Sequence, residues 1–357
     1  MLIIITNFFL NLNWITHLNL RFFGSLFTSF FILLIFGPFL INYLKKKKVH
    51  QIIRKEGPNL HKKKKNVPTM GGILIIFSIT ISVLLWSNLQ NIQVWYVLIT
   101  LLMYSIIGFI DDYKKIKNQN STGLRSCWKY FFQSISALLI GFFLCVNNEN
   151  YLSIKLILPL LNPIIIKLNF VTYIILIYFI LVGTSNGVNL TDGLDGLAIM
   201  PVILISFGST IMLFIIGNIN IANYFNVIYL KYANELNIIY ASIIGSGLGF
   251  LWFNTYPSQI IMGDTGSLGL GGILGILAIL THQEFFFFIM SGVFIIETIS
   301  VILQMISFKL YKKRIFYMAP IHHHYELKGY SEPKIVIRIW IISIIFLLIS
   351  LIIFIGF

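Results

Sequence analysis

Acidic side chains are scarce in this sequence, which has 12 Asp and Glu residues against 26 Lys and Arg residues in a chain of 357. All charged residues together make up 11% of the chain, and hydrophobic residues make up 57%. A soluble domain carries about 25% charged residues, so this composition excludes an ordinary soluble fold. The polar stretches are too short to form a second domain. We therefore expect residues 1–357 to form one polytopic membrane domain.

Cysteine is almost absent. Cys127 and Cys145 lie 18 residues apart, at the two ends of one apolar run, and a helix of that length separates them by about 27 Å. Disulfide-bonded Cα atoms lie within about 7 Å of each other. The sequence therefore excludes a disulfide between them, and we expect no cysteine-based metal site.

Positive charge is plentiful, with a net charge of +14, but its distribution argues against a nucleic-acid partner. The basic residues gather in short loops between apolar runs, which is typical of the cytoplasmic loops of membrane proteins. We expect the lipid bilayer, and no nucleic acid, to be the surrounding partner.

The apolar runs are long enough to cross a membrane, because about 20 helical residues span the hydrocarbon core. The sequence predicts an all-α integral membrane protein, a bundle of about ten transmembrane helices. The predicted spans are residues 22–44, 71–88, 94–110, 128–146, 170–185, 197–217, 238–252, 266–281, 285–308 and 335–356. The run 266–281 is rich in glycine, which suits close contact between helices.

Ten spans place five loops on one side of the membrane. These loops are residues 45–70, 111–127, 186–196, 253–265 and 309–334. Together with Lys129, they hold 21 of the 26 basic residues. This excess marks their side as cytoplasmic and both termini as external.

All five aspartates fall on the same side, at or just beyond the ends of apolar runs. They are Asp111, Asp112, Asp192, Asp195 and Asp264. Mg²⁺ commonly takes one or two carboxylates together with substrate phosphates as ligands. An acid-poor membrane protein that gathers its aspartates in this way is predicted to hold a divalent cation and phosphates at one membrane face. The alternative is that the acids only mark the membrane boundary.

Asp111 and Asp112 come at the C-terminal end of a predicted helix. The helix dipole disfavours negative charge there, and two adjacent carboxylates repel each other. A cation bound between them would offset both costs. In the alternative, Lys114 and Lys115 are simple counter-charges at a solvated helix end.

The segment 186–196 reads NGVNLTDGLDG, so that Asn186, Asn189, Asp192 and Asp195 recur every three residues. On helical backbone this spacing turns the four side chains toward one face, and the glycines leave room for a ligand near the backbone. The pattern favours a polar binding surface over a loop or cap.

Asp264 lies between glycines, in the sequence MGDTG, just before a predicted span. Aspartate is a good N-cap, so this residue could cap the helix, hold a metal ion, or do both.

The loop 309–334 carries six basic residues and three consecutive histidines at 322–324. Neighbours in a row cannot all face one metal ion, and no cysteine accompanies them. With basic residues at 312–314 nearby, the loop is predicted to bind phosphate or pyrophosphate. Glu297 lies within an apolar span, where a carboxylate is costly and usually paired or functional.

These motifs together resemble the polyprenyl-phosphate N-acetylhexosamine-1-phosphate transferase superfamily, over most of the chain. The matching segments are KKNVPTMGG (64–72), the pair Asp111–Asp112, NGVNLTDGLDG (186–196), FNTYPSQIIMGDTGSLGLGG (253–272), ETISVILQ (297–304) and MAPIHHHYELKGY (318–330). The aspartate motifs are shared across the superfamily. The triple histidine with the following Glu-Leu-Lys-Gly resembles its muramoyl-pentapeptide branch.

The resemblance implies a cytoplasmic-facing active-site cleft in a bacterial inner (cytoplasmic) membrane. It implies Mg²⁺-dependent transfer of phospho-N-acetylmuramoyl-pentapeptide from UDP-N-acetylmuramoyl-pentapeptide to undecaprenyl phosphate. The products would be UMP and lipid I, an intermediate of peptidoglycan biosynthesis. A homodimer is a further possibility.

The resemblance also implies roles for individual residues. Asp264 would be the direct Mg²⁺ ligand, with Asp192 as a second metal residue. Asp111 and Asp112 would be the essential pair, one of them a base toward the lipid phosphate, and His323 and His324 would face the diphosphate or sugar. The implied substrate-binding residues are Lys64, Thr69, Lys129, Asn186, Asn189, Asp192, Asp195, Asn254 and His322. The chain departs from the family at Ile261, where a Phe able to stack on uracil is expected.

Several alternatives stay open from the sequence. A sister enzyme would transfer N-acetylglucosamine-1-phosphate for another surface polymer. A secondary transporter would also carry intramembrane carboxylates, although transporter sites usually lie near the bilayer midplane. The sequence also leaves open whether the lipid phosphate attacks directly or whether an enzyme-bound intermediate forms first.

Overall fold

The computed structural model describes residues 17–50, 67–120, 122–146, 155–158, 164–225 and 227–356. The helices are α2 (Leu18–Lys46), α3 (Gly72–Trp86), α4 (Ile92–Lys117), α5 (Ser126–Val146), α6 (Phe170–Thr191), α7 (Ile199–Ile216), α8 (Ile219–Tyr224), α9 (Ala233–Asn254), α10 (Gly263–Leu280), α11 (Glu284–Met290), α12 (Gly292–Tyr311), α13 (Ile321–Leu327) and α14 (Glu332–Ile355). The strands are β1 (Lys155–Leu158) and β2 (Ile164–Lys167).

The prediction of an all-α membrane protein is confirmed. Within the described ranges, nine helices are long and apolar enough to cross a membrane, and α3 is a shorter apolar helix of 15 residues. These ten helices follow the order of the ten predicted spans. A helix pairs its backbone polar groups internally, which is why apolar segments of this length are helical in a bilayer.

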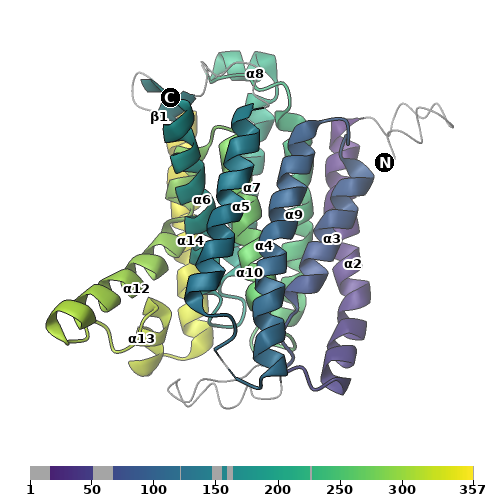
Figure 1. The fold of residues 1–357 in the computed structure, drawn as a ribbon. Helices are drawn as coiled ribbons and strands as arrows, with labels where there is room; N and C mark the ends of the chain where they lie inside the picture. The colour runs from purple at the N-terminus through teal and green to yellow at the C-terminus, as the bar shows by residue number, and fades with distance from the viewer. Residues whose placement is uncertain are drawn as a thin grey trace.

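One predicted span is interrupted. The sequence predicts a single helix over 285–308, whereas the structure separates α11 from α12 at Ser291. Gly292 begins α12 in close contact with α14, since a Cβ on this residue would lie 2.6 Å from the ring of Phe346. The break therefore coincides with a tight helix contact. Beyond it, α12 leans away from the rest of the bundle (Figure 1).

A short antiparallel hairpin is a second departure, because the sequence predicts an all-α protein with no strand between the spans 128–146 and 170–185. β1 pairs with β2 in a register that runs from Lys155↔Lys167 to Leu158↔Ile164. Consecutive isoleucines in β2 favour extended backbone. The hairpin is a small addition at the edge of the helical bundle.

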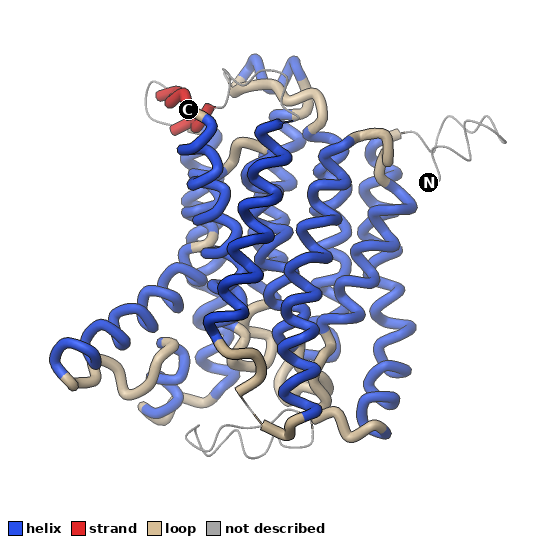
Figure 2. The backbone as a smooth tube through the Cα atoms, in the orientation of Figure 1, coloured by secondary structure: helices blue, strands red, loops and turns tan. Residues whose placement is uncertain are grey.

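Successive connections alternate between the two ends of the bundle (Figure 1). The start of α2, the hairpin, α8 and the end of α14 lie at one end. The end of α4 lies at the opposite end, where Figure 2 shows connecting loops in tan. The helix order thus brings the aspartate-bearing segments toward one end of the molecule.

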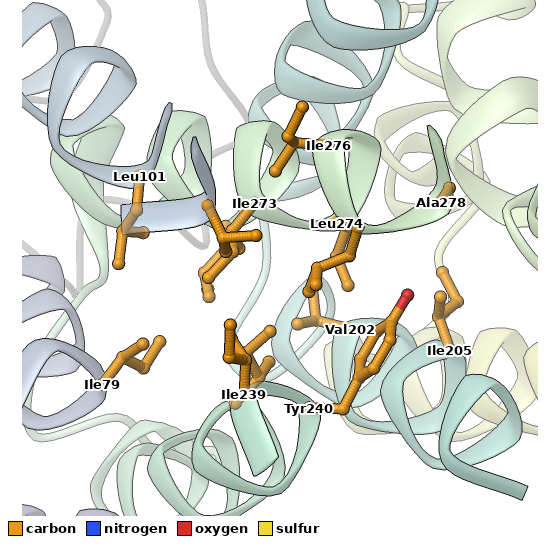
Figure 3. Packing of buried hydrophobic residues seen from close by; sticks show 14 of the residues in the cluster. Ile79, Leu101, Val202, Ile205, Ile239, Tyr240, Ile273, Leu274, Ile276 and Ala278 are labelled. Carbon is orange, nitrogen blue, oxygen red and sulfur yellow. The ribbon is translucent and has the colours of Figure 1, made fainter. Parts of the chain in front are cut away.

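The central helix of the bundle is α10. Its side chains are buried along almost its whole length, and it packs on α3, α4 and α6. Figure 3 shows Ile273 and Leu274 of α10 beside Leu101, Val202 and Ile239 from three other helices. In a bilayer such contacts stabilise the bundle mainly by van der Waals packing, because lipid is as apolar as the core.

Two glycines explain how closely α10 approaches its neighbours. A Cβ on Gly72 of α3 would lie 2.2 Å from the backbone nitrogen of Gly266, and a Cβ on Gly271 would lie 2.5 Å from Cα of Ser185 in α6. Small residues permit this separation of helix backbones. The glycine-rich span thus makes the close helix contacts that its sequence favours, and these contacts position Asp264.

Candidate active site

Three carboxylates from two helices lie close together at the end of the bundle where α4 ends. Asp111 and Asp112 lie near the end of α4, and Asp264 lies in the first turn of α10. One oxygen from each carboxylate lies within 4.8 Å of the other two. Gly108 permits the approach, because a Cβ there would lie 2.1 Å from the carbonyl oxygen of Asp264. We call these three residues the aspartate triad.

Asp112 holds the start of α10. Its carboxylate accepts hydrogen bonds from the backbone N–H of Asp264 at 3.1 Å, and from the backbone N–H and hydroxyl of Thr265 at 2.9 and 2.8 Å. The first N–H groups of a helix have no partner within it, and α10 has no side-chain cap of its own. Asp112 therefore acts as a cap supplied by another helix, while Asp264 does not cap α10. Gly263, at φ 76°, completes this turn in the left-handed conformation that glycine favours.

Asp111 fixes the segment that follows α4. Its Oδ1 accepts a hydrogen bond of 2.7 Å from the backbone N–H of Leu124. Its Oδ2 lies 2.6 Å from Nζ of Lys115, one helical turn further along α4. The two adjacent aspartates thus have different structural partners, although the sequence presents them as an equivalent pair.

Asp264 is the most exposed member of the triad, at 16% of its side chain against 4% for each of the others. Its Oδ2 lies 2.7 Å from Nζ of Lys129 and 2.9 Å from Nζ of Lys115. Its Oδ1 accepts a hydrogen bond of 2.9 Å from the amide of Asn189. Asn189 also donates to the hydroxyl of Ser267 at 2.8 Å. Asp264 is therefore the carboxylate at which α4, α5 and α6 converge.

The chemistry of the triad fits a hard divalent cation. All three members offer carboxylate oxygens, which suit Mg²⁺ or Mn²⁺, whereas zinc sites are usually built from imidazole and thiolate. The oxygens lie close enough together for one ion to contact more than one of them. Among the described residues, this triad is the group of carboxylates, histidines and thiols that could hold a metal ion.

Asp192 lies directly after the last residue of α6. Burial, and then the negative charges of Asp264, Asp112 and Asp195, raise the pKa of its carboxyl group to about 8. The negative charges of the triad therefore act on Asp192. Its carboxylate oxygens are not among the oxygens that lie within 4.8 Å of one another in the triad. Its predicted role as a metal ligand stays a prediction.

The predicted polar ladder of 186–196 divides between separate partners. Asn189 contacts Asp264, but the amide of Asn186 donates to the side chain of Gln133 in α5 at 2.9 Å. Asn186 also donates to the carbonyl of Val182, one turn back in α6, at 2.8 Å. Asn186 thus ties α6 to α5 beside the site, whereas Asn189 reaches the triad itself.

Asp195 and Asn254 hold two loops together. The backbone N–H of Asp195 donates to Glu332 at 2.8 Å, and its carboxylate accepts from the backbone N–H of Ser258 at 3.0 Å. Asn254 accepts from the backbone N–H of Gly196 at 2.9 Å. Both side chains are buried. The structure therefore gives them a scaffolding role, and substrate binding by them stays a prediction.

Thr69 lies beside the triad, since a Cβ on Gly263 would be 3.2 Å from its hydroxyl. Ile261, the departure from the family pattern, is buried, and its backbone N–H donates to the carbonyl of Pro68 at 2.9 Å. This bond joins the segment before α3 to the segment before α10. Lys64, a predicted substrate contact, lies outside the described residues.

His322 and Glu297 form a buried pair. Nδ1 of His322 lies 3.0 Å from a carboxylate oxygen of Glu297 in α12, and both side chains are almost fully buried. A Cβ on Gly193 would lie 2.2 Å from Nε2 of His322, so the ring packs directly on the backbone next to Asp192. The intramembrane carboxylate is thus paired, as its position in the sequence predicts.

The other two histidines have partners of their own. Nδ1 of His323 lies 2.6 Å from a carboxylate oxygen of Glu326. His324 accepts a hydrogen bond of 3.1 Å from the backbone N–H of Tyr317 and stacks on the ring of that residue. Partial burial, and then the charge of Lys328, lower the pKa of His324. Donor binding by His323 and His324 stays a prediction.

Sequence reasoning considered Lys115 only as a counter-charge of Asp111 and Asp112, and it missed several other residues that complete the site. Lys115 contacts every member of the triad, and its spacing of four from Asp111 on a helix predicts only the contact with Asp111. The available signal for Gln133 was that it is a polar residue inside the predicted apolar span 128–146. Thr265 and Glu332 had none, because their partners lie more than 100 residues away in the chain.

The fold and this acidic, lysine-lined site are those of a polytopic membrane transferase. Residues 94–282, more than half of the chain, match the family described as Glycosyl transferase family 4. The matched range includes almost all of α4 and the whole of α6 and α10, which carry the triad and Asn189. The chain therefore belongs to this glycosyl transferase family.

Three individual proteins are similar to this chain over almost its whole length. Proteins from Buchnera aphidicola subsp. Acyrthosiphon pisum, strains 5A, APS and Tuc7, are each 57% identical to the chain over 343 residues. The alignments cover 96% of this chain and 96% of each relative. Each of these relatives is named phospho-N-acetylmuramoyl-pentapeptide-transferase.

Proposed function

We propose that this chain transfers phospho-N-acetylmuramoyl-pentapeptide from its UDP-linked donor to undecaprenyl phosphate, which yields lipid I and UMP in peptidoglycan biosynthesis. The names of relatives that match almost the whole chain support the assignment. The observation that carries it is the aspartate triad, with two lysine ammonium groups on Asp264. This arrangement suits a reaction between phosphate groups.

Charge is the main obstacle in such a reaction, because an anionic lipid phosphate must approach an anionic diphosphate. Fixed positive groups at the site lower this cost in the transition state. Lys129 and Lys115 are both within reach of Asp264, the most exposed carboxylate of the triad. We assign the two lysines to the donor diphosphate and to the charge that develops on the leaving UMP.

The triad would hold the metal ion. Asp264, with Oδ2 of Asp111, would bind Mg²⁺, which when bound neutralises phosphate charge and aligns the reacting groups. Asn189 orients Asp264 through its 2.9 Å hydrogen bond. The position of Asp264 therefore depends on α6 as well as on its own helix.

The two adjacent aspartates would differ in their roles. Asp112 already accepts three hydrogen bonds from the start of α10, so its oxygens are committed to structure. Oδ2 of Asp111 instead contacts the flexible side chain of Lys115. We therefore assign to Asp111, through Oδ2, a contact with the metal ion beside Asp264, and to Asp112 the role of holding the start of α10.

The membrane topology follows the same proposal. Multiple apolar helices support a multi-pass membrane protein, and we place it in the bacterial cytoplasmic membrane. The triad and the basic loops would face the cytoplasm, where a UDP-linked donor is available, and would line a cleft open to that side. A homodimer stays a prediction from the family resemblance.

Replacement of Asp264 tests the proposal. Asp264→Asn keeps the shape of the side chain and should abolish Mg²⁺-dependent release of UMP from UDP-N-acetylmuramoyl-pentapeptide, while the purified protein stays folded. Near wild-type turnover of Asp264→Asn at limiting Mg²⁺ would exclude Asp264 as the metal ligand. Ion-driven flux in proteoliposomes without any UMP release would instead support a transporter.

A further inference from the structure

Lys115 holds an unusual position within the triad. Its Nζ lies 2.6 Å from Oδ2 of Asp111, 2.9 Å from Oδ2 of Asp264 and 3.8 Å from Oδ1 of Asp112. One ammonium group therefore contacts all three carboxylates. Lys129, by comparison, makes an ion pair with Asp264 alone among the three.

A bound cation and this ammonium group would compete for the same oxygens. Mg²⁺ binds its oxygen ligands at about 2.0–2.1 Å. An ion ligated by Oδ2 of Asp111 and Oδ2 of Asp264 would lie between those atoms, where Nζ of Lys115 lies. Like charges a few ångströms apart repel strongly near a protein surface. The triad therefore accommodates either the ammonium group or the metal ion at these oxygens.

The lysine, rather than the carboxylates, is the partner that can move. The Lys115 side chain is 28% exposed, whereas Asp111 and Asp112 are each 4% exposed. Asp112 is fixed by the start of α10, and Asp111 by the backbone N–H of Leu124. A lysine reaches its partners through a flexible four-carbon stem. Movement of its ammonium group toward the exposed side of Asp264 requires no change in the helices.

We infer that Lys115 is an exchangeable counter-ion of the triad, which leaves its oxygens when the divalent cation binds and then contacts the donor diphosphate. The inference rests on the proposed function. It has a consequence for binding, because a diphosphate that receives the displaced ammonium group favours the metal-bound arrangement. Metal and donor should therefore strengthen each other's binding, by equal factors in the two directions.

The experiment measures Mn²⁺ binding to the purified full-length protein by electron paramagnetic resonance, with and without UDP as the diphosphate probe. Without UDP, Lys115→Met should bind Mn²⁺ about tenfold or more tightly than wild type, because the competing charge is gone. Lys129→Met is the matched control. Its affinity for Mn²⁺ should rise less, because Lys129 contacts only one carboxylate of the triad. UDP should tighten Mn²⁺ binding in wild type, and Lys115→Met should lose most of this gain.

The outcomes separate the inference from the proposed function. If wild type binds Mn²⁺ at a site that Asp264→Asn removes, but Lys115→Met binds it no more tightly, the counter-ion exchange is wrong and the metal site stands. If wild type has no such site, both are wrong. Should Lys115→Met unfold, Lys115→Gln removes the same charge and carries the same expectation, whereas Lys115→Arg should not tighten Mn²⁺ binding.

Discussion

Replacement of Asp112 by asparagine should destabilise the protein as well as inactivate it. In the structure the carboxylate of Asp112 accepts three hydrogen bonds, all from the first turn of α10. The asparagine side chain would keep one carbonyl oxygen, which would still accept from the two donors of Thr265, and would place its N–H₂ group opposite the backbone N–H of Asp264. Two donors that face each other cannot form a hydrogen bond, so the start of α10 would lose part of its cap.

The size of the effect can be estimated from these contacts. A hydrogen bond to a charged acceptor contributes about 1.5–3 kcal/mol, and loss of a helix N-cap costs about 0.5–2 kcal/mol. Because asparagine retains one acceptor, we expect a loss of about 2 kcal/mol in the free energy of unfolding, where the two ranges overlap. In a bundle whose central helix is α10, this loss should lower the melting temperature by several degrees.

Thermal unfolding of the purified protein in detergent, with a chelator present and no substrate, measures this effect. Asp111→Asn is the matched control, since Asp111 accepts a single backbone hydrogen bond, from Leu124, and none from α10. Its melting temperature should fall less. A melting temperature of Asp112→Asn equal to that of wild type, or a larger fall for Asp111→Asn, would refute the assignment of Asp112 as the cap of α10.

Three other predictions concern Gly193, the carboxyl group of Asp192 and the membrane topology. Gly193→Ala should disturb the histidine loop and reduce turnover severely, because its Cβ would lie 2.2 Å from Nε2 of His322; unchanged kinetics would contradict that packing. Folding raises the pKa of Asp192 from 3.8 to about 8. Between pH 4 and 8 the folded chain therefore holds a proton that the unfolded chain has released, and the free energy of unfolding should fall as the pH rises through this range. With a chelator present, Asp192→Asn should flatten that decline in melting temperature, and an unchanged slope would argue against the shift. In a cysteine-free background, a cysteine at exposed Asn118 should react with an impermeant thiol reagent only in inverted membranes, and one at exposed Asn220 only in intact cells; the reverse pattern would overturn the topology.

The helical spans were accessible from the sequence because their signal is local. Each span is a run of apolar residues whose length matches the bilayer, and the ten predicted segments have counterparts in the structure. The break at Ser291 was not accessible in this way. Its local signal is only the Ser291-Gly292 pair within an apolar run without proline, and it coincides with a contact between Gly292 and Phe346, which is 54 residues further along the chain.

The site was predictable in its chemistry and less so in its geometry. Spacing alone brings Asn189 toward a ligand face, and it contacts Asp264. The same spacing includes Asp195, whose carboxylate instead holds a distant loop through Ser258. A repeat of three residues shows which side chains share a face of ideal helix, but α6 ends at Thr191. Beyond that residue, the direction of each side chain is set by tertiary contacts.

The position of Lys115 shows the same limit. Its sequence spacing from Asp111 predicts an ordinary ion pair on one helix. Its contact with Asp264 depends on how closely α10 approaches α4, which the small residue Gly108 permits. The sequence contains each of these residues, but their convergence requires the packed bundle.

The most direct test of the proposed function is a donor comparison with the purified enzyme, undecaprenyl phosphate and Mg²⁺. UMP release and formation of a lipid-linked product are measured with UDP-N-acetylmuramoyl-pentapeptide and with UDP-N-acetylglucosamine, and each reaction is repeated with a chelator. We predict turnover with the muramoyl-pentapeptide donor, loss of that turnover with the chelator, and little or no product from UDP-N-acetylglucosamine. Turnover of UDP-N-acetylglucosamine alone, or full activity without a divalent cation, would contradict the account.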